Sequence, residues 1–134
     1  MVCVYCGSRT QVTNSRPQKR LRQVWRRRSC TECGAIFTTN ESVDFSTSLV
    51  VRGTAGNVRP FSRDQLFVSI LRAVGHREAP IDDAGALTAT ITGKLQHGAK
   101  TAALTRADII DTALQVLKHF DRAAAVQYAA YHKV

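Results

Sequence analysis

Apolar residues in the C-terminal two thirds of the chain recur at the three- and four-residue spacing of amphipathic helices. The first predicted helix follows Ser62, an N-cap residue, with Gln65 three positions later as the second half of a capping box. Its apolar stripe consists of Leu66, Phe67, Ile70, Leu71 and Val74. Gly75 is predicted to end this helix.

Three further helices are predicted from the same kind of pattern. Their predicted caps are Asp82 or Asp83, then Thr105 together with Asp108, and finally Asp121. The second helix is expected to end at Gly98, and the third presents an apolar face that includes Ile110, Leu114 and Leu117. Ahead of the first helix, residues 48–52 and 58–61 flank a glycine-rich turn at residues 53–57 and predict a β-hairpin.

The N-terminal third has no helical spacing and is rich in arginine. Residues 14–17 are interpreted as a turn, and residues 19–28 as an extended segment in which alternate side chains share a face. The even-numbered face would present a row of cations, namely Arg20, Arg22, Arg26 and Arg28, together with Val24. The odd-numbered face, which also carries Arg27, would pack Leu21 and Trp25 against the rest of the domain.

All four cysteines lie in this arginine-rich third, as two C-x-x-C pairs formed by Cys3 with Cys6 and Cys30 with Cys33. Each pair can present two sulfurs from one tight turn to a tetrahedral Zn²⁺ ion. Gly7 and Gly34 follow the pairs directly, where such a turn favours a positive φ. The spacing predicts a structural zinc ribbon; two disulfides, or a redox-active pair, remain the alternatives.

Charge is as unevenly distributed as the cysteines. Residues 1–33 contain eight basic side chains and one acidic one, a net charge of +7, whereas the rest of the chain has 11 basic and 9 acidic residues. A Zn²⁺ ion on four thiolates contributes −2 and leaves +5. This density favours a polyanion such as double-stranded DNA as a partner, although a solvated basic strand without a ligand would share the pattern.

Several classes of protein are disfavoured. No apolar run approaches the roughly 20 residues needed to cross a bilayer, and no leader segment follows Met1, so we expect a cytoplasmic protein. No Ser/His/Asp set, paired carboxylates or P-loop predicts an enzyme, and the four histidines are interpreted as ordinary surface or boundary residues.

The order of motifs resembles the NrdR family, bacterial repressors of ribonucleotide reductase genes. Besides the cysteine pairs, VTNSR at residues 12–16 is similar to the family's V-x-D-S-R, RRRSC at residues 26–30 to its R-R-R-x-C, and FTTNE at residues 37–41 to its F-T-T-x-E. The resemblance implies an α+β protein with a zinc ribbon at residues 1–46, associated with the bacterial nucleoid. The residues then expected to contact promoter DNA are Arg16, Arg20, Arg22, Arg26, Arg27 and Arg28.

Residues 47–134 resemble the ATP-cone of the same family, a mainly helical nucleotide-sensing domain with a β-hairpin. The resemblance rests on LVVR at residues 49–52, on Gly56, on PFS at residues 60–62 and on VQYAAY at residues 126–131. It implies that ATP and dATP are regulatory ligands that alter the oligomeric state of the protein. The homo-oligomer would bind paired sites on DNA. The residues implied for the nucleotide are Val50, Val51, Arg52, Gly56, Phe61, Tyr128 and Tyr131.

One departure from the family pattern sets the alternative hypothesis. The family usually has V-K-R-x-G in the hairpin, with two cations facing phosphates, whereas this chain has VRGTAG at residues 51–56. Under the alternative, the chain is a constitutive zinc-ribbon module for nucleic acid whose cone no longer senses nucleotides.

Overall fold

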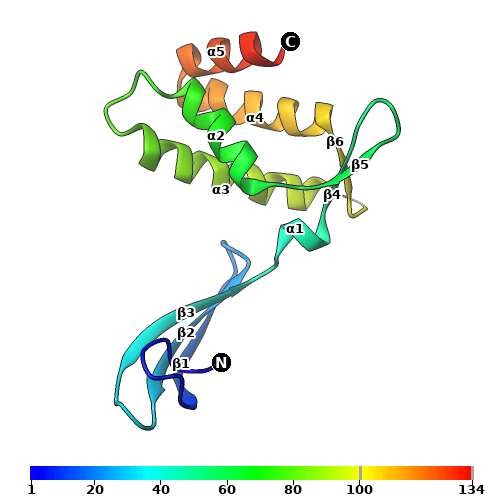
Figure 1. Ribbon diagram of the computed structural model, residues 1–134. Helices are drawn as coiled ribbons and strands as arrows, with labels where there is room; N and C mark the ends of the chain where they lie inside the picture. Colours follow the sequence, from blue (N-terminus) through cyan, green and yellow to red (C-terminus); the bar gives the residue numbers. More distant parts are fainter. Residues whose placement is uncertain (100, 134) are drawn as a thin grey trace. The chain divides into compact units, whose positions relative to one another are not determined.

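The computed structural model describes residues 1–99 and 101–133, which form two compact units, Met1–Val43 and Asp44–Val134 (Figure 1). The first unit is an antiparallel sheet, and the second combines helices with a small mixed sheet, so the predicted α+β class is confirmed. The division falls after Val43. Asp44 is the N-cap of the short helix that begins the second unit, and its side chain accepts a hydrogen bond from the Ser46 backbone N–H.

Three strands in the order β1-β2-β3 make up the first unit: β1 (Thr10–Gln18), β2 (Gln23–Cys30) and β3 (Ile36–Ser42). The turn expected at residues 14–17 is wrong, since these residues pair with β2 as part of β1. Pro17 is tolerated there because β1 is an edge strand, and an edge residue can lack a backbone N–H without breaking the ladder. A register shift between Val12 and Asn14 marks a bulge in the same strand.

The extended segment expected at residues 19–28 begins four residues later than predicted. Residues 19–22 form the β1–β2 turn, in which the N–H of Leu21 donates to the carbonyl of Gln18 and Arg22 adopts a φ of 51°. Arg20 and Arg22 therefore do not share a strand face with Arg26, and Leu21 is 60% exposed instead of packing beside Trp25.

Four long helices and one short one dominate the second unit: α1 (Phe45–Ser48), α2 (Arg63–Ala73), α3 (Pro80–Gly98), α4 (Arg106–Phe120) and α5 (Arg122–His132). Three of the predicted N-caps are confirmed, namely Ser62, Thr105 and Asp121, and Asp108 forms a capping box with Thr105. The capping box predicted at Ser62 is only half present among the described residues, since Gln65 donates its backbone N–H to Ser62 but its side chain does not bond back. The cap predicted at Asp82 or Asp83 is wrong, because α3 starts earlier with Pro80 in its first turn and has no side-chain cap. Proline suits this position, where its missing N–H has no intrahelical partner.

A small sheet lies at one end of the helices, in the order β5-β4-β6 (Figure 1). The predicted hairpin is confirmed as β4 (Val50–Arg52) and β5 (Val58–Pro60), which pair antiparallel. Sequence analysis missed β6 (Ala103–Thr105), which pairs parallel with β4 and leads directly into α4. The sheet therefore joins the start of the unit to its second half.

The apolar core of the second unit lies where α2, α3, α4 and α5 pack against one another. Ile70, Ile91 and Leu117 are fully buried there, and Tyr128 of α5 is 1% exposed. Phe61, which follows β5, is buried in the same cluster and fixes the hairpin to the helices. Among the described residues, no helix is both long and apolar enough to cross a membrane.

Candidate metal centre, basic sheet and anion cavity

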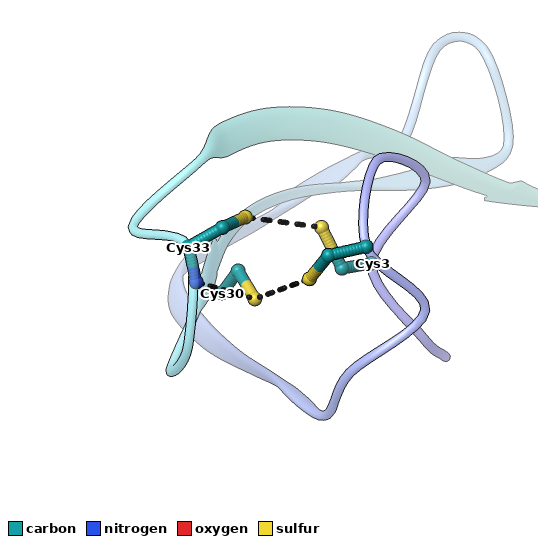
Figure 2. A group of neighbouring side chains, drawn as sticks. Cys3, Cys30 and Cys33 are labelled. Atoms are coloured by element: carbon teal, nitrogen blue, oxygen red, sulfur yellow. Dashed lines mark hydrogen bonds between the residues drawn. The ribbon is translucent and has the colours of Figure 1, made fainter.

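The four cysteines converge at one end of the three-stranded sheet. Their sulfur atoms all lie within 4.8 Å of one another, with Cys3 Sγ 3.7 Å from Cys33 Sγ and Cys6 Sγ 3.5 Å from Cys30 Sγ (Figure 2). A tetrahedral ion with metal–sulfur bonds of about 2.3 Å sets its ligands about 3.8 Å apart, close to these separations. A disulfide needs about 2.05 Å, and all four cysteines are free, so the disulfide alternative is not supported. The cluster is the set of ligands expected for zinc.

Two tight turns hold the sulfurs in place. Gly7 has a φ of 75° and Gly34 a φ of 69°, which confirms the positive φ predicted after each cysteine pair. Backbone N–H groups point at the sulfurs, since Tyr5 N lies 3.5 Å from Cys3 Sγ and Glu32 N lies 3.4 Å from Cys30 Sγ. Such donors favour thiolates, which are the form that binds a metal ion.

Neighbouring groups shift the pKa values of the Cys6 and Cys33 thiols in opposite directions. Hydrogen bonds from the backbone and then the hydroxyl of Ser8, followed by Cys30, lower the pKa of Cys6 to about 6. A backbone hydrogen bond from Ala35 lowers the pKa of Cys33, but its bonds with Cys6 and Cys30 outweigh this and raise the pKa to about 12. Four neighbouring sulfurs cannot all be anionic without a cation between them, and a divalent metal ion removes that repulsion.

The sheet beside the metal centre has two chemically different faces. Residues that pair directly across antiparallel strands lie on the same face, so the strand register assigns each side chain. We call one side the tryptophan face; its central residues are Asn14, Arg16, Trp25, Arg27, Thr38 and Asn40. We call the other side the glutamate face; its central residues are Ser15, Arg26, Arg28, Phe37, Thr39 and Glu41.

The arginines of the glutamate face are engaged within the sheet. Arg26 Nη2 lies 3.0 Å from Glu41 Oε2, and Arg28 Nε donates to Thr39 Oγ1 at 3.1 Å. Tyr5 from the first cysteine turn packs edge-on against Phe37 on the same face. Both arginines are half-buried, whereas Arg27 between them points to the opposite face and is exposed.

A cavity of about 370 Å³ opens in the second unit between the β4–β5 hairpin and helices α2, α4 and α5. Its polar lining consists of Arg52, Thr54, Asn57, Arg59, Ser62, Gln65, Ser69, Arg106 and His132. Its apolar lining includes Val51, Phe61, Leu66, Ile109 and Tyr128. None of the described lining residues is acidic, so three arginines give the cavity a net positive charge.

Four of the seven residues expected at a nucleotide line this cavity, namely Val51, Arg52, Phe61 and Tyr128. The other three do not: Val50, Gly56 at the tip of the hairpin, and Tyr131, which is 61% exposed. Sequence analysis missed Arg59 and Arg106. Arg59 lies in a strand of three residues and has no cationic neighbour there. Arg106 begins a helix about 50 residues after the hairpin in sequence. Neither arginine is therefore part of a local motif that indicates an anion site.

One wall of the cavity is formed by a group of side chains from α2 and α5. His132 Nε2 lies 2.8 Å from Ser69 Oγ, and the rings of His132 and Tyr128 have centroids 4.3 Å apart. Burial, and then the charge of Arg106, lower the pKa of His132. Burial raises the pKa of Tyr128. This wall therefore combines the rings of His132 and Tyr128, with Arg106 near enough to affect the pKa of His132.

Comparison with known proteins gives one family for the whole chain. Residues 1–41 match the family model described as "Transcriptional repressor NrdR-like, N-terminal domain". The protein called transcriptional repressor NrdR in Nitrosomonas eutropha is 31% identical over 134 residues, covering 99% of this chain and 82% of its own length. The chain belongs to the NrdR family of transcriptional repressors.

Relatives from other bacteria agree with this assignment. Proteins with the same name from a Methylobacterium species and from Sinorhizobium medicae are 36% and 34% identical, each over 99% of this chain and over 71% and 84% of their own lengths. The NrdR family consists of transcriptional repressors and not of enzymes, as the lack of a catalytic set predicted. The resemblance inferred from the cysteine, arginine and F-T-T-x-E motifs is thus confirmed.

Proposed function

We propose that this protein is a zinc-dependent repressor of ribonucleotide reductase genes, which binds double-stranded promoter DNA through residues 1–43. The single observation that carries the proposal is the convergence of four sulfurs within 4.8 Å beside a basic sheet, in a chain of the NrdR family. The metal centre fixes a sheet too small to fold on apolar packing alone. Its rigid strands then hold arginines at positions that a duplex can meet.

Charge supports DNA as the partner of this unit. Residues 1–43 contain eight basic side chains and two acidic ones, and one of the acids, Glu41, is paired with Arg26. Neutralising DNA phosphates releases counterions, so such a surface binds duplex DNA with strong dependence on salt. Zinc-bound Cys3, Cys6, Cys30 and Cys33 would support this surface without contacting DNA themselves.

We further propose that the cavity in the second unit binds ATP and dATP as regulatory ligands. Arg52, Arg59 and Arg106 supply the positive charge that a triphosphate needs, from two strands and one helix. Apolar lining residues, of which Val51 and Ile109 are partly exposed, supply surface for a purine ring. The cavity thus has three cations although the hairpin lacks the family's Lys-Arg pair, and this favours nucleotide sensing over the constitutive alternative.

Regulation would act through assembly of the repressor. A nucleotide alters DNA affinity only if it binds one oligomeric arrangement better than another. One small ribbon makes few contacts with DNA, whereas several ribbons held at the correct spacing bind far more tightly. ATP and dATP would therefore control repression by selecting homo-oligomers with different ribbon spacing.

Light scattering after size-exclusion chromatography tests the regulatory half. The zinc-loaded protein is run without nucleotide, with ATP and with dATP, and anisotropy of a labelled duplex is measured under the same three conditions. We expect the molar mass and the DNA affinity to change together with nucleotide. Identical masses and affinities in all three conditions, with no calorimetric heat on adding either nucleotide, would establish the constitutive module instead. Absence of DNA binding in every condition would refute both.

A further inference from the structure

The strand register points to a specific DNA-contacting surface, because the three consecutive arginines of β2 do not face the same way. Arg27 pairs with Asn14 of β1 and Thr38 of β3 on the tryptophan face, whereas Arg26 and Arg28 lie on the glutamate face. Only one face of a single sheet can be pressed against a duplex. The question is therefore which of the two faces is free to meet it.

Existing contacts of its arginines argue against the glutamate face. Arg26 is held by Glu41 at 3.0 Å and Arg28 by Thr39 at 3.1 Å. DNA approaching this face would also meet the carboxylate of Glu41, whose side chain is 68% exposed, and the Tyr5–Phe37 pair. A negative charge facing phosphates is repulsive, and breaking the existing contacts would cost part of the binding energy.

The tryptophan face has the opposite properties. Among the described residues of the three strands, no acidic side chain lies on it. Arg16 and Arg27 are exposed, and neither takes part in a salt bridge within the described residues. Arginine pairs with phosphate oxygens or guanine edges, and Asn14 and Asn40, both exposed, have the amide group that pairs with adenine.

Trp25 lies in the middle of this surface. It pairs with Arg16 of β1 on one side and with Asn40 of β3 on the other, and its side chain is only half-buried. The sequence predicted that Leu21 and Trp25 pack together against the domain, but Leu21 is exposed in the turn and Trp25 is only partly covered. An indole flanked by a guanidinium and an amide offers an apolar plate for a thymine methyl or deoxyribose, with polar groups beside it for hydrogen bonds.

We propose that the tryptophan face, with Arg16, Trp25 and Arg27 at its centre, is the surface of this protein that contacts duplex DNA. Arg26 and Arg28 are positioning residues that stabilise the sheet from its other side. The proposal rests on the DNA-binding function proposed above and specifies which half of the basic sheet performs it.

Neighbouring arginines of β2 provide a matched test. Arg26→Ala, Arg27→Ala and Arg28→Ala each remove one positive charge from the same strand, so the long-range electrostatic loss is equal in all three. The probe is a labelled duplex of about 40 base pairs, roughly four helical turns, selected from a randomised pool by the wild-type, zinc-loaded full chain. Zinc content and thermal melting verify that each variant keeps its fold.

We expect Arg27→Ala to weaken binding roughly 5- to 150-fold, the range for losing a direct contact with DNA. Arg26→Ala and Arg28→Ala should each cost less than about threefold, as for a screened charge that makes no contact. Losses from Arg26→Ala or Arg28→Ala equal to or larger than that from Arg27→Ala would overturn the proposal. A pool that yields no bound duplex would instead refute DNA binding itself.

Trp25 gives a second readout that needs no charge substitution. It is the only tryptophan in the chain, so its emission reports on this face alone. We expect its emission to be quenched or shifted when the wild-type protein binds the duplex, and Arg16→Ala to weaken binding as Arg27→Ala does. Unchanged emission at saturating duplex would overturn the proposal even if an arginine variant failed to fold.

Discussion

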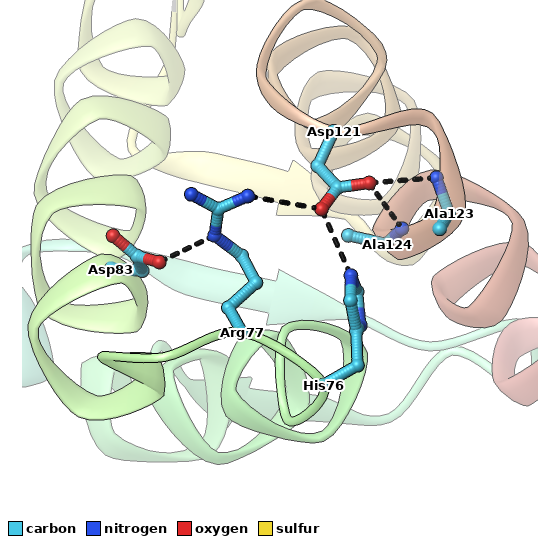
Figure 3. A network of polar contacts seen from close by, with 6 residues as sticks. All are labelled: His76, Arg77, Asp83, Asp121, Ala123 and Ala124. Atoms are coloured by element: carbon cyan, nitrogen blue, oxygen red, sulfur yellow. Dashed lines mark hydrogen bonds and ion pairs between the residues drawn. The ribbon is translucent and has the colours of Figure 1, made fainter.

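The Nε2 atom of His76 lies 2.9 Å from the Oδ2 atom of Asp121, which joins the segment after α2 to the corner between α4 and α5 (Figure 3). The same carboxylate accepts a hydrogen bond from Arg77 at 3.2 Å, and its other oxygen caps α5 through the N–H groups of Ala123 and Ala124. Arg77 also pairs with Asp83 and stacks over the ring of Phe120, 4.5 Å from its centroid. One aspartate therefore connects three helical segments.

This network predicts how the helical unit responds to acid. The hydrogen bond from His76, with smaller contributions from α5 N–H groups and Arg77, lowers the pKa of Asp121 to about 2. The stabilisation is fully present above the ordinary aspartate pKa of about 3.9 and is lost as the pH falls toward the folded value. Asp121→Asn keeps an oxygen to cap α5 but removes the charge.

We therefore expect the melting temperature of Asp121→Asn, followed by helical circular dichroism, to depend less on pH below about 4 than that of the wild type. Asp64→Asn is a suitable control, because Asp64 is an exposed residue in the first turn of α2 outside this network. Parallel pH profiles for the wild type and Asp121→Asn would contradict the role of the charge.

The metal centre predicts that the two units lose structure separately. Cys30→Ser removes one thiolate ligand, and the remaining three sulfurs cannot complete a tetrahedral site. We expect zinc content to fall well below one ion per chain and residues 1–43 to lose protection from amide exchange, while the helical unit keeps its melting transition. Thr31→Ser, at the exposed neighbouring position, should retain zinc. A folded first unit without metal would exclude a structural role for zinc.

Arg106, one of the two cavity arginines that sequence analysis missed, allows a prediction about the strength of nucleotide binding. Arg106 opens α4 at the edge of the cavity, whereas Arg122 opens α5 outside it. If Arg106 pairs with a phosphate, Arg106→Ala should weaken ATP and dATP binding by about 10- to 100-fold, the effect of losing a charge-assisted hydrogen bond. Arg122→Ala, which makes the same change in net charge, should leave the calorimetric Kd nearly unchanged. Equal effects of the two substitutions would mean that only overall charge matters.

Two buried threonines of α3 predict stability changes of opposite sign. Thr88 Oγ1 is buried and has no hydrogen-bond partner among the described residues, whereas Thr92 Oγ1 donates to the carbonyl of Thr88 at 2.7 Å. Valine preserves the shape of each side chain but removes the hydroxyl. We expect Thr88→Val to raise the free energy of unfolding by about 1 kcal/mol and Thr92→Val to lower it by about the same amount. Urea denaturation of the two variants beside the wild type measures both, and destabilisation by Thr88→Val would reveal a partner for its hydroxyl.

Features set by neighbouring residues were predictable from the sequence. The caps at Ser62, Thr105 and Asp121 follow from side chains that bond to backbone N–H groups two or three positions away. The cysteine turns follow in the same way from C-x-x-C-G, because a residue with positive φ is needed directly after each pair.

Features that depend on distant residues were not predictable. The alternation of side chains along β2 places Arg27 on the opposite face from Arg26 and Arg28. It does not indicate on which face the arginines are bound to other side chains of the sheet. That depends on Glu41 and Phe37 of β3, which the chain brings beside β2 only after the second cysteine turn. Likewise, β6 is three residues long and is recognisable only by its pairing with β4.

The parallel pairing of Val50 with Ala103 closes a chain segment of about 50 residues, which contains all of α2 and α3. Walls of the cavity come from inside that segment, namely the hairpin and α2, and from the chain after it, namely α4 and α5. No partly folded intermediate that lacks the β4–β6 pair can present a complete cavity. A ligand that fills the cavity thus stabilises the whole helical unit against cooperative unfolding. At a free concentration one hundred times its Kd, it raises the free energy of unfolding by about 2.7 kcal/mol.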